Sequence, residues 1–134
     1  MAVILDSAAI VGFLDRDDAL HPAAAEAIGG LLTEQRLLAS VVTFAEVLTG
    51  AQLMHHEEGL VRGFFADLVA EVLPVDVATA ERAAKLRAGH RFLRMPDALI
   101  LAAADLHPEA DALLTGDTRF AAVDGVACRV DLLG

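Results

Sequence analysis

The 134-residue chain has no tryptophan, no tyrosine and a single cysteine, Cys128. One cysteine excludes an internal disulfide and any metal site built from several thiolates. The chain also lacks an apolar run near the ~20 residues that a membrane-spanning helix needs. No basic segment precedes its first apolar stretch, which argues against a signal peptide. We therefore expect a cytoplasmic protein that does not interact with membranes.

Acidic residues outnumber basic ones, and the formal net charge is −10. Such a balance argues against non-specific binding to nucleic acid. Half of the ten cationic side chains nevertheless lie in one short stretch before Asp97. Glu81 and Lys85 can form an i,i+4 pair on a solvated helix face, but this explains only the lysine. The cluster therefore predicts a surface for an anionic ligand, formed by Arg82, Lys85, Arg87, Arg91 and Arg94.

The length of the chain suits one domain over residues 1–134. Along it, short apolar segments alternate with segments that have helical periodicity. This alternation predicts an α/β fold with a mostly parallel central sheet and right-handed crossovers. The predicted strands are Ala2–Leu5, Leu37–Val42, Val72–Val75, Ala112–Thr115 and Val126–Val130. The main predicted helices are Ser7–Leu14, Pro22–Leu32, Glu57–Val69, Ala78–Phe92 and a buried one that begins near Pro96.

Three acidic residues stand where this fold would gather them. Asp6 and Asp117 follow predicted strands, and the carboxyl ends of parallel strands meet at the edge where ligands bind. Asp97 lies in the first turn of the helix that begins near Pro96. Each acid also has a plain structural explanation, since an aspartate can cap a helix or interact with its dipole.

Glu46 is a fourth candidate, with two open interpretations. Thr43 and Glu46 have the spacing of a capping box, in which the glutamate would face its own helix end. The same helix also begins at the carboxyl edge of the sheet, so Glu46 can instead face Asp6. The sequence does not choose between the two.

Four acids from distant parts of the chain can thus meet in one pocket. Such like charges repel, and some bind protons unless a cation neutralises them. A site with only oxygen ligands favours a hard ion, Mg²⁺ or Mn²⁺. Such an ion can polarise a phosphodiester.

Four segments together are similar to the motifs of PIN domains, and within them to VapC toxins of toxin–antitoxin pairs. These are Ile4–Ser7, Val42–Gly50, Pro96–Ala103 and Leu114–Phe120. The resemblance implies an α/β/α sandwich with strand order 3-2-1-4-5. It also implies a metal-dependent endoribonuclease whose products carry a 5′-phosphate and a 3′-hydroxyl.

By match to the family motifs, Asp6 and Asp97 would be the main metal ligands. Glu46 and Asp117 would complete the site or hold water, and Ser7 and Thr115 would donate hydrogen bonds from behind the acids. Some members carry a further acid after the equivalent of Asp117, where this chain has Thr118. The resemblance also implies a homodimer and a VapB-like antitoxin whose C-terminal tail covers the acidic pocket.

Two other functions fit parts of the pattern. A receiver or haloacid-dehalogenase-like domain needs a lysine after a late strand, but the only lysine is Lys85, and Ala8 stands where a second aspartate is expected. A non-catalytic PIN-like module that only pairs with a protein or RNA is the other alternative. Metal-dependent cleavage of RNA distinguishes that module from a nuclease.

Overall fold

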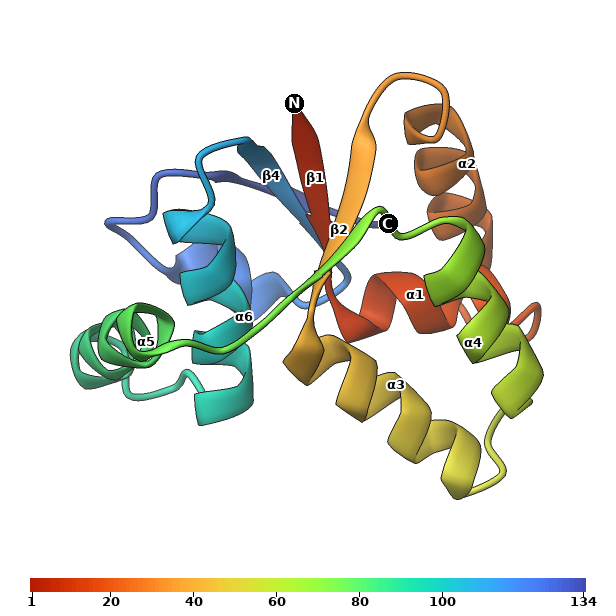
Figure 1. The fold of residues 1–134 in the computed structure, drawn as a ribbon, viewed down its shortest axis with the longest axis horizontal. Coiled ribbons are helices and arrows are strands. Elements are labelled where there is room, and N and C mark those ends of the chain that lie inside the picture. The colour runs from red at the N-terminus through yellow and green to blue at the C-terminus, as the bar shows by residue number, and fades with distance from the viewer.

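A five-stranded, all-parallel sheet forms the centre of the computed structural model, which describes residues 1–134 (Figure 1). The strand order is β3-β2-β1-β4-β5, so the predicted order is confirmed. Strand β1 is central and pairs with β2 and β4. The strands are β1 (Ala2–Leu5), β2 (Arg36–Ser40), β3 (Glu71–Leu73), β4 (Ala110–Thr115) and β5 (Arg129–Leu132).

Helices cover both faces of the sheet. The first layer holds α1 (Ser7–Leu14), α2 (His21–Leu31), α3 (Val41–Gln52) and α4 (Glu58–Asp67). The second holds α5 (Val77–Gly89), α6 (Met95–Leu106) and the short 3₁₀ helix η1 (Thr118–Ala122). None of these helices has both the length and the apolar composition to cross a bilayer.

The alternation of side chains along each strand divides the core in two. Ile4 and Leu113 face α5 and α6, where Leu101 is also buried. Val3 and Leu5 face the other way, toward the layer of α1 to α4. All four residues of β1 are buried, which agrees with the prediction of a strand covered on both faces.

The start of α3 differs from the prediction. The strand predicted over Leu37–Val42 ends at Ser40, and the helix begins at Val41. Ser40 is extended, and its Oγ accepts a hydrogen bond from the Val42 N–H at 3.1 Å. The capping box between Thr43 and Glu46 is therefore wrong, because Thr43 is a buried residue inside the helix.

The last strand also differs from the prediction. The strand predicted over Val126–Val130 is wrong at its start, because β5 begins at Arg129. Cys128 lies before the strand and packs into the core on the α6 side. The preceding loop is held by Asp105 of α6, whose Oδ1 accepts from the Ala127 N–H at 2.6 Å. Cys128 is thus buried, and Val126 partly buried, by packing against the core and not by pairing in the sheet.

Candidate active site

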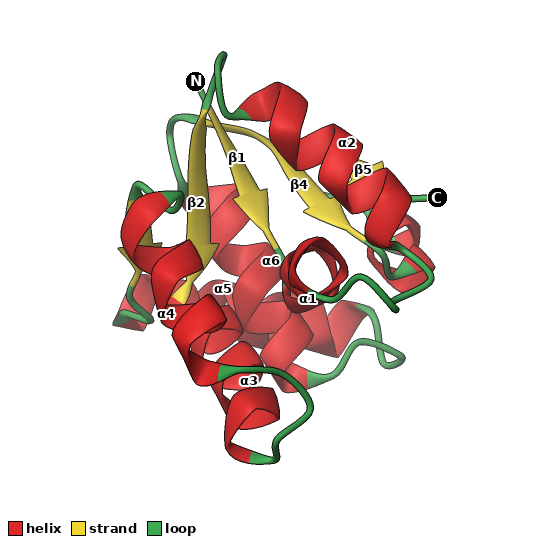
Figure 2. Ribbon diagram, turned by 90° about the vertical axis from the view of Figure 1, so that its right-hand side faces the viewer, coloured by secondary structure: helices red, strands yellow, loops and turns green.

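The four predicted acids line one cavity of about 120 Å³. Its acids follow β1 and β4 or lie near the starts of α3 and α6, which places the cavity at the carboxyl edge of the sheet. Figure 2 shows the arrows of β1, β2 and β4 pointing toward this edge. Asp6 ends β1, Asp97 lies in the first turn of α6, and Asp117 follows β4. The lining residues are Asp6, Ser7, Ala8, Glu46, Arg94, Asp97, Ile100, Asp117 and Phe120.

Asp6 is the most buried of the four acids, with 4% of its surface exposed. It caps α1, since its Oδ1 accepts from the Ala9 N–H at 2.9 Å, and its Oδ2 accepts from the Thr115 hydroxyl. Burial raises the pKa of the Asp6 carboxyl to about 6, even though both hydrogen bonds lower it. The negative charges of Asp117 and Asp97 add to the rise. Asp6 is therefore a carboxylate whose charge lacks compensation.

Thr115 joins Asp6 to the loop that carries Asp117. This fully buried threonine ends β4, and its hydroxyl donates to Asp6 while accepting from the Asp117 N–H at 3.0 Å. One hydroxyl therefore fixes the side chain of one acid and the backbone of another. The structure places Thr115 where the family resemblance expects a donor.

Glu46 faces the cavity from the second turn of α3. Its Oε1 accepts from the Ser7 Oγ at 2.6 Å, although the two residues are far apart in the chain. Because α3 begins at Val41, Glu46 lies beyond the first turn and is not a partner of the helix cap. Of the two interpretations that the sequence left open, the structure shows the one in which Glu46 lies beside Asp6.

Asp97 and Asp117 differ from the other two acids because arginines lie on them. Arg119 Nη2 is 2.5 Å from Asp117 Oδ2 and 3.8 Å from Asp97 Oδ2. Arg94 Nε is 3.3 Å from the same Asp97 oxygen. The side-chain hydrogen bond from Arg119 holds the pKa of Asp117 below its ordinary value, and that pair raises the pKa of Arg119.

Arg119 also belongs to the site, although it was not among the residues predicted from the sequence. Its backbone N–H donates to Asp117 Oδ1 at 2.9 Å, which starts η1, and its guanidinium returns to the same carboxylate. An arginine two residues after a strand-end aspartate was visible in the sequence. Side chains two residues apart do not meet on an α-helix, so this spacing did not predict a contact between Arg119 and Asp117.

The predicted basic cluster is spread over several environments. Arg82 Nε lies 2.6 Å from Asp105 Oδ2, and its Nη2 donates to the Gly125 carbonyl, so this side chain holds a loop. Arg87 Nη1 donates to the carbonyl of Arg91 at 3.2 Å. Of the five cations, only Arg94 lines the cavity. Lys85 and Arg91 are exposed, and their role in RNA binding stays a prediction.

The donor chemistry of the cavity suits a hard divalent cation. Its ionisable ligands are carboxylates, and histidine and cysteine are absent from its lining. The buried, uncompensated Asp6 is the kind of group that a cation would stabilise. As the side chains lie, no group of three or more acidic, histidine or cysteine side chains is arranged to hold a metal ion.

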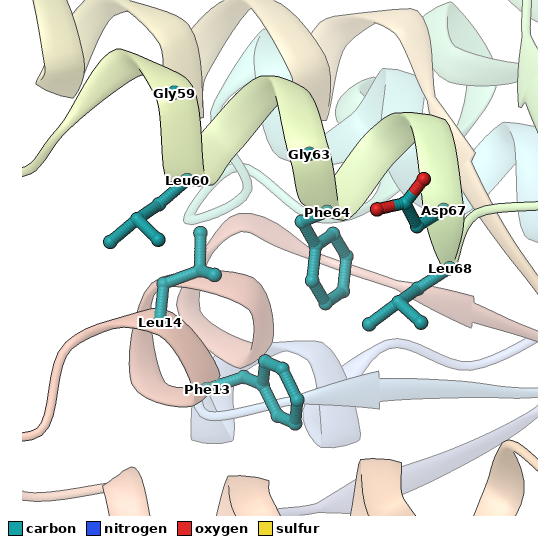
Figure 3. A pocket seen from close by; sticks show the side chains of 8 residues that line it. All are labelled: Phe13, Leu14, Gly59, Leu60, Gly63, Phe64, Asp67 and Leu68. Carbon is teal, nitrogen blue, oxygen red and sulfur yellow. The ribbon is translucent and has the colours of Figure 1, made fainter.

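A second cavity, of about 320 Å³, is an apolar groove between α1 and α4 (Figure 3). Phe13 and Leu14 of α1 face Leu60 and Phe64 of α4 across it. Asp67 is the single charged residue in its lining. The groove holds no pair of groups that could exchange protons, so it is less suited to chemistry than the acidic cavity.

Comparisons with known proteins agree with this geometry. The family model described as PIN domain matches residues 3–126. A toxin–antitoxin complex from Klebsiella pneumoniae has a chain 29% identical to this one, with a TM-score of 0.72 over 93% of this chain and 95% of that one. VapBC-5 from Mycobacterium tuberculosis, described as a member of the VapBC family of toxin–antitoxin systems, is 29% identical, with a TM-score of 0.64 over 98% and 97%.

A more distant match shows likeness of fold alone. VapC20 from Mycobacterium tuberculosis, described as a sarcin-ricin loop cleaving toxin, is 18% identical and has a TM-score of 0.72 over 95% of this chain and 98% of that one. A search among curated proteins finds none that matches.

Proposed function

The chain belongs to the PIN-domain family, and from this premise we propose that it is the toxin of a toxin–antitoxin pair. Its activity would be metal-dependent endoribonucleolytic hydrolysis of RNA phosphodiester bonds, leaving a 5′-phosphate and a 3′-hydroxyl. The observation that carries this proposal is the convergence of Asp6, Glu46, Asp97 and Asp117 on one cavity from four separate segments. A fold alone would not support an activity, but a fold with this set of acids does.

Asp6 and Asp97 would hold a Mg²⁺ or Mn²⁺ ion, with Glu46 and Asp117 supplying further oxygen ligands. Such an ion, when bound, would polarise the RNA phosphate and make water a better nucleophile. Asp6 is held by Thr115 and by the Ala9 N–H, so it would keep its orientation as RNA enters. Its raised pKa means that a cation would displace a proton from it below pH ~6.

Glu46 would orient the attacking water, because Ser7 engages one of its oxygens and fixes the carboxylate toward the cavity. Arg94 lines the cavity and is largely exposed, so it would contact the phosphate next to the cleaved bond. Exposed Lys85 and Arg91 would extend this contact along the RNA. These cations would offset the repulsion of RNA by a protein of net charge −10.

The proposed partner is a cognate VapB-like antitoxin. The support comes from the relative of 29% identity from Klebsiella pneumoniae, which is described as a toxin–antitoxin complex. An antitoxin segment that covered the acidic cavity would exclude RNA and inhibit the enzyme. A homodimer of this chain is proposed on the same family resemblance.

The test measures metal binding and cleavage on the same samples. Antitoxin-free protein is incubated with structured RNAs in Mg²⁺, Mn²⁺ or chelator, beside Asp97→Asn and the control Asp131→Asn, which alters an exposed acid on β5. A metal at about 100 times its Kd should stabilise the folded state by about 2.7 kcal/mol. We expect this rise in Tm, and discrete cuts, in the wild type and the control but not in Asp97→Asn.

Other outcomes would contradict parts of the proposal. Metal-dependent cuts that persist in Asp97→Asn would show that the acids are misassigned. A metal-dependent rise in Tm without cuts in any RNA would favour the non-catalytic binding module.

A further inference from the structure

Two of the four carboxylates in the cavity are already paired with a cation from the chain itself. Both oxygens of Asp117 accept from Arg119 Nε at 3.0 Å, and Oδ2 also accepts from Nη2 at 2.5 Å. The same Nη2 approaches Asp97 Oδ2 at 3.8 Å. The guanidinium of Arg119 thus lies between two proposed metal ligands that come from different elements.

The other two acids have only neutral partners. Asp6 accepts from Thr115 and from the Ala9 N–H, and Glu46 accepts from Ser7. The cavity therefore has one half with an arginine and one half without a cation. A divalent ion that used all four acids would need the oxygens that Arg119 now holds.

The Arg119 side chain is not required to build the turn on which it lies. The backbone N–H of Arg119, and not its guanidinium, caps η1 by donating to Asp117 Oδ1. The side chain is 46% exposed. It can therefore move into solvent without opening the core, and its two-residue separation from Asp117 allows it to return readily.

We propose that Arg119 is an internal counter-cation that holds Asp117 beside Asp97 in the metal-free protein and must be displaced before a divalent ion can use Asp117. This inference rests on the proposed metal-dependent function. Arginine and the ion compete because Mg²⁺ requires direct contact with ligand oxygens at ~2.1 Å, in the directions where Arg119 now donates. The apparent affinity for the metal is then the intrinsic affinity multiplied by the fraction of molecules in which Arg119 is not bound to Asp117.

The first test is calorimetric titration of Mn²⁺ into the wild type and Arg119→Gln, without RNA. Exposed ion pairs of this kind are weak, so we expect the variant to bind Mn²⁺ about two- to fivefold more tightly. Removing any positive charge near the cavity would also favour a cation. Arg94→Gln controls for this effect, because it removes the same charge from the rim but makes only one contact, with Asp97 at 3.3 Å.

The second test follows the Arg119 guanidinium directly, by the Nε–H resonances of ¹⁵N-labelled protein titrated with Mg²⁺. The Arg119 resonance, assigned from its loss in Arg119→Gln, should move toward the position of a free guanidinium. Arg129 is an internal control, because it also pairs with an aspartate two residues away, Asp131 at 2.7 Å, but lies on the edge strand β5. Its resonance should stay unchanged.

The outcomes separate this inference from the proposed function. Metal binding with an unmoved Arg119 resonance would overturn the inference and leave the proposed metal site intact. An equal gain in affinity for Arg94→Gln and Arg119→Gln would also overturn it, since charge alone would then account for the effect. Absence of Mn²⁺ binding in both the wild type and Arg119→Gln would overturn the metal site and the inference together.

Discussion

Replacing Asp6 with asparagine should make the metal-free protein more stable at neutral and basic pH. The folded protein holds this carboxyl at a pKa of about 6, above the ordinary aspartate value of 3.8, mainly because of burial. For an acid with a raised pKa, the stabilising effect of protonation is complete below the unfolded value and is lost as the pH rises through the folded value. Ionised Asp6 thus destabilises the fold above pH ~6.

The difference between the two pKa values means that ionising Asp6 lowers the free energy of unfolding by about 3 kcal/mol. Asparagine is as good a helix cap as aspartate, so the bond from the Ala9 N–H should persist. The pKa of about 6 already includes the hydrogen bond from Thr115 to the ionised carboxylate, so the loss of this charged acceptor subtracts nothing further. Asp6→Asn should therefore stabilise the protein by about 3 kcal/mol at pH 8 and by little near pH 4.

Urea unfolding in the presence of chelator, at several values between pH 4 and pH 8, measures this difference. The control is Asp17→Asn, which removes an exposed acid that does not line the cavity. At pH 8 the free energy of unfolding of Asp6→Asn should exceed that of the wild type by about 3 kcal/mol, and near pH 4 the two should be close. Parallel pH profiles for the wild type and Asp6→Asn would refute the reasoning, because the charge of Asp6 would then cost the fold nothing.

Two further predictions concern the hydrogen bonds of the site and the path of RNA. Thr115→Val keeps the shape of the side chain but leaves the Asp117 N–H and Asp6 without their shared partner. Thr115→Val should lower the free energy of unfolding, measured in urea, by about 1–3 kcal/mol, and Thr115→Ser should restore most of this stability. Equal stability of the valine variant and the wild type would contradict the prediction. Replacing Arg91 and Arg94 together by alanine should reduce the salt dependence of RNA binding, measured by fluorescence anisotropy in chelator, by about 0.7 per lost contact in the log–log slope. An unchanged slope would remove both arginines from the RNA path.

The α/β class and three of the four acids could be placed from the sequence because they depend on coarse features, whereas the strand order was implied by the resemblance to PIN domains. A continuous apolar run such as Ala2–Leu5 fits a strand buried on both faces, as the structure shows. Parallel strands end at one edge, so Asp6 and Asp117 had to lie near each other once both were assigned to strand ends. The first turn of α6 brings Asp97 to the same place.

The remaining features depend on local competition that the sequence does not resolve. Ser40 and Thr43 are both good caps, and the choice of Ser40 decides where Glu46 points. Val126 and Cys128 were assigned to a strand because they are apolar, yet Asp105 holds their loop outside the sheet. Arg119 lies in a 3₁₀ turn, where no regular periodicity marks which side chains meet.

The central position of β1 has a consequence for how the site opens. Its amides lie between β2 and β4, beneath helices on both faces, so they should exchange with solvent only when the whole protein unfolds. Asp117 and η1 adjoin the partly exposed edge strand β5, whose amides can exchange through local opening. A ligand that joined Asp6 to Asp117 would connect these regions and extend slow exchange outward to residues 118–122. A ligand in the cavity would then slow the amide hydrogen exchange of a segment at the edge of the fold.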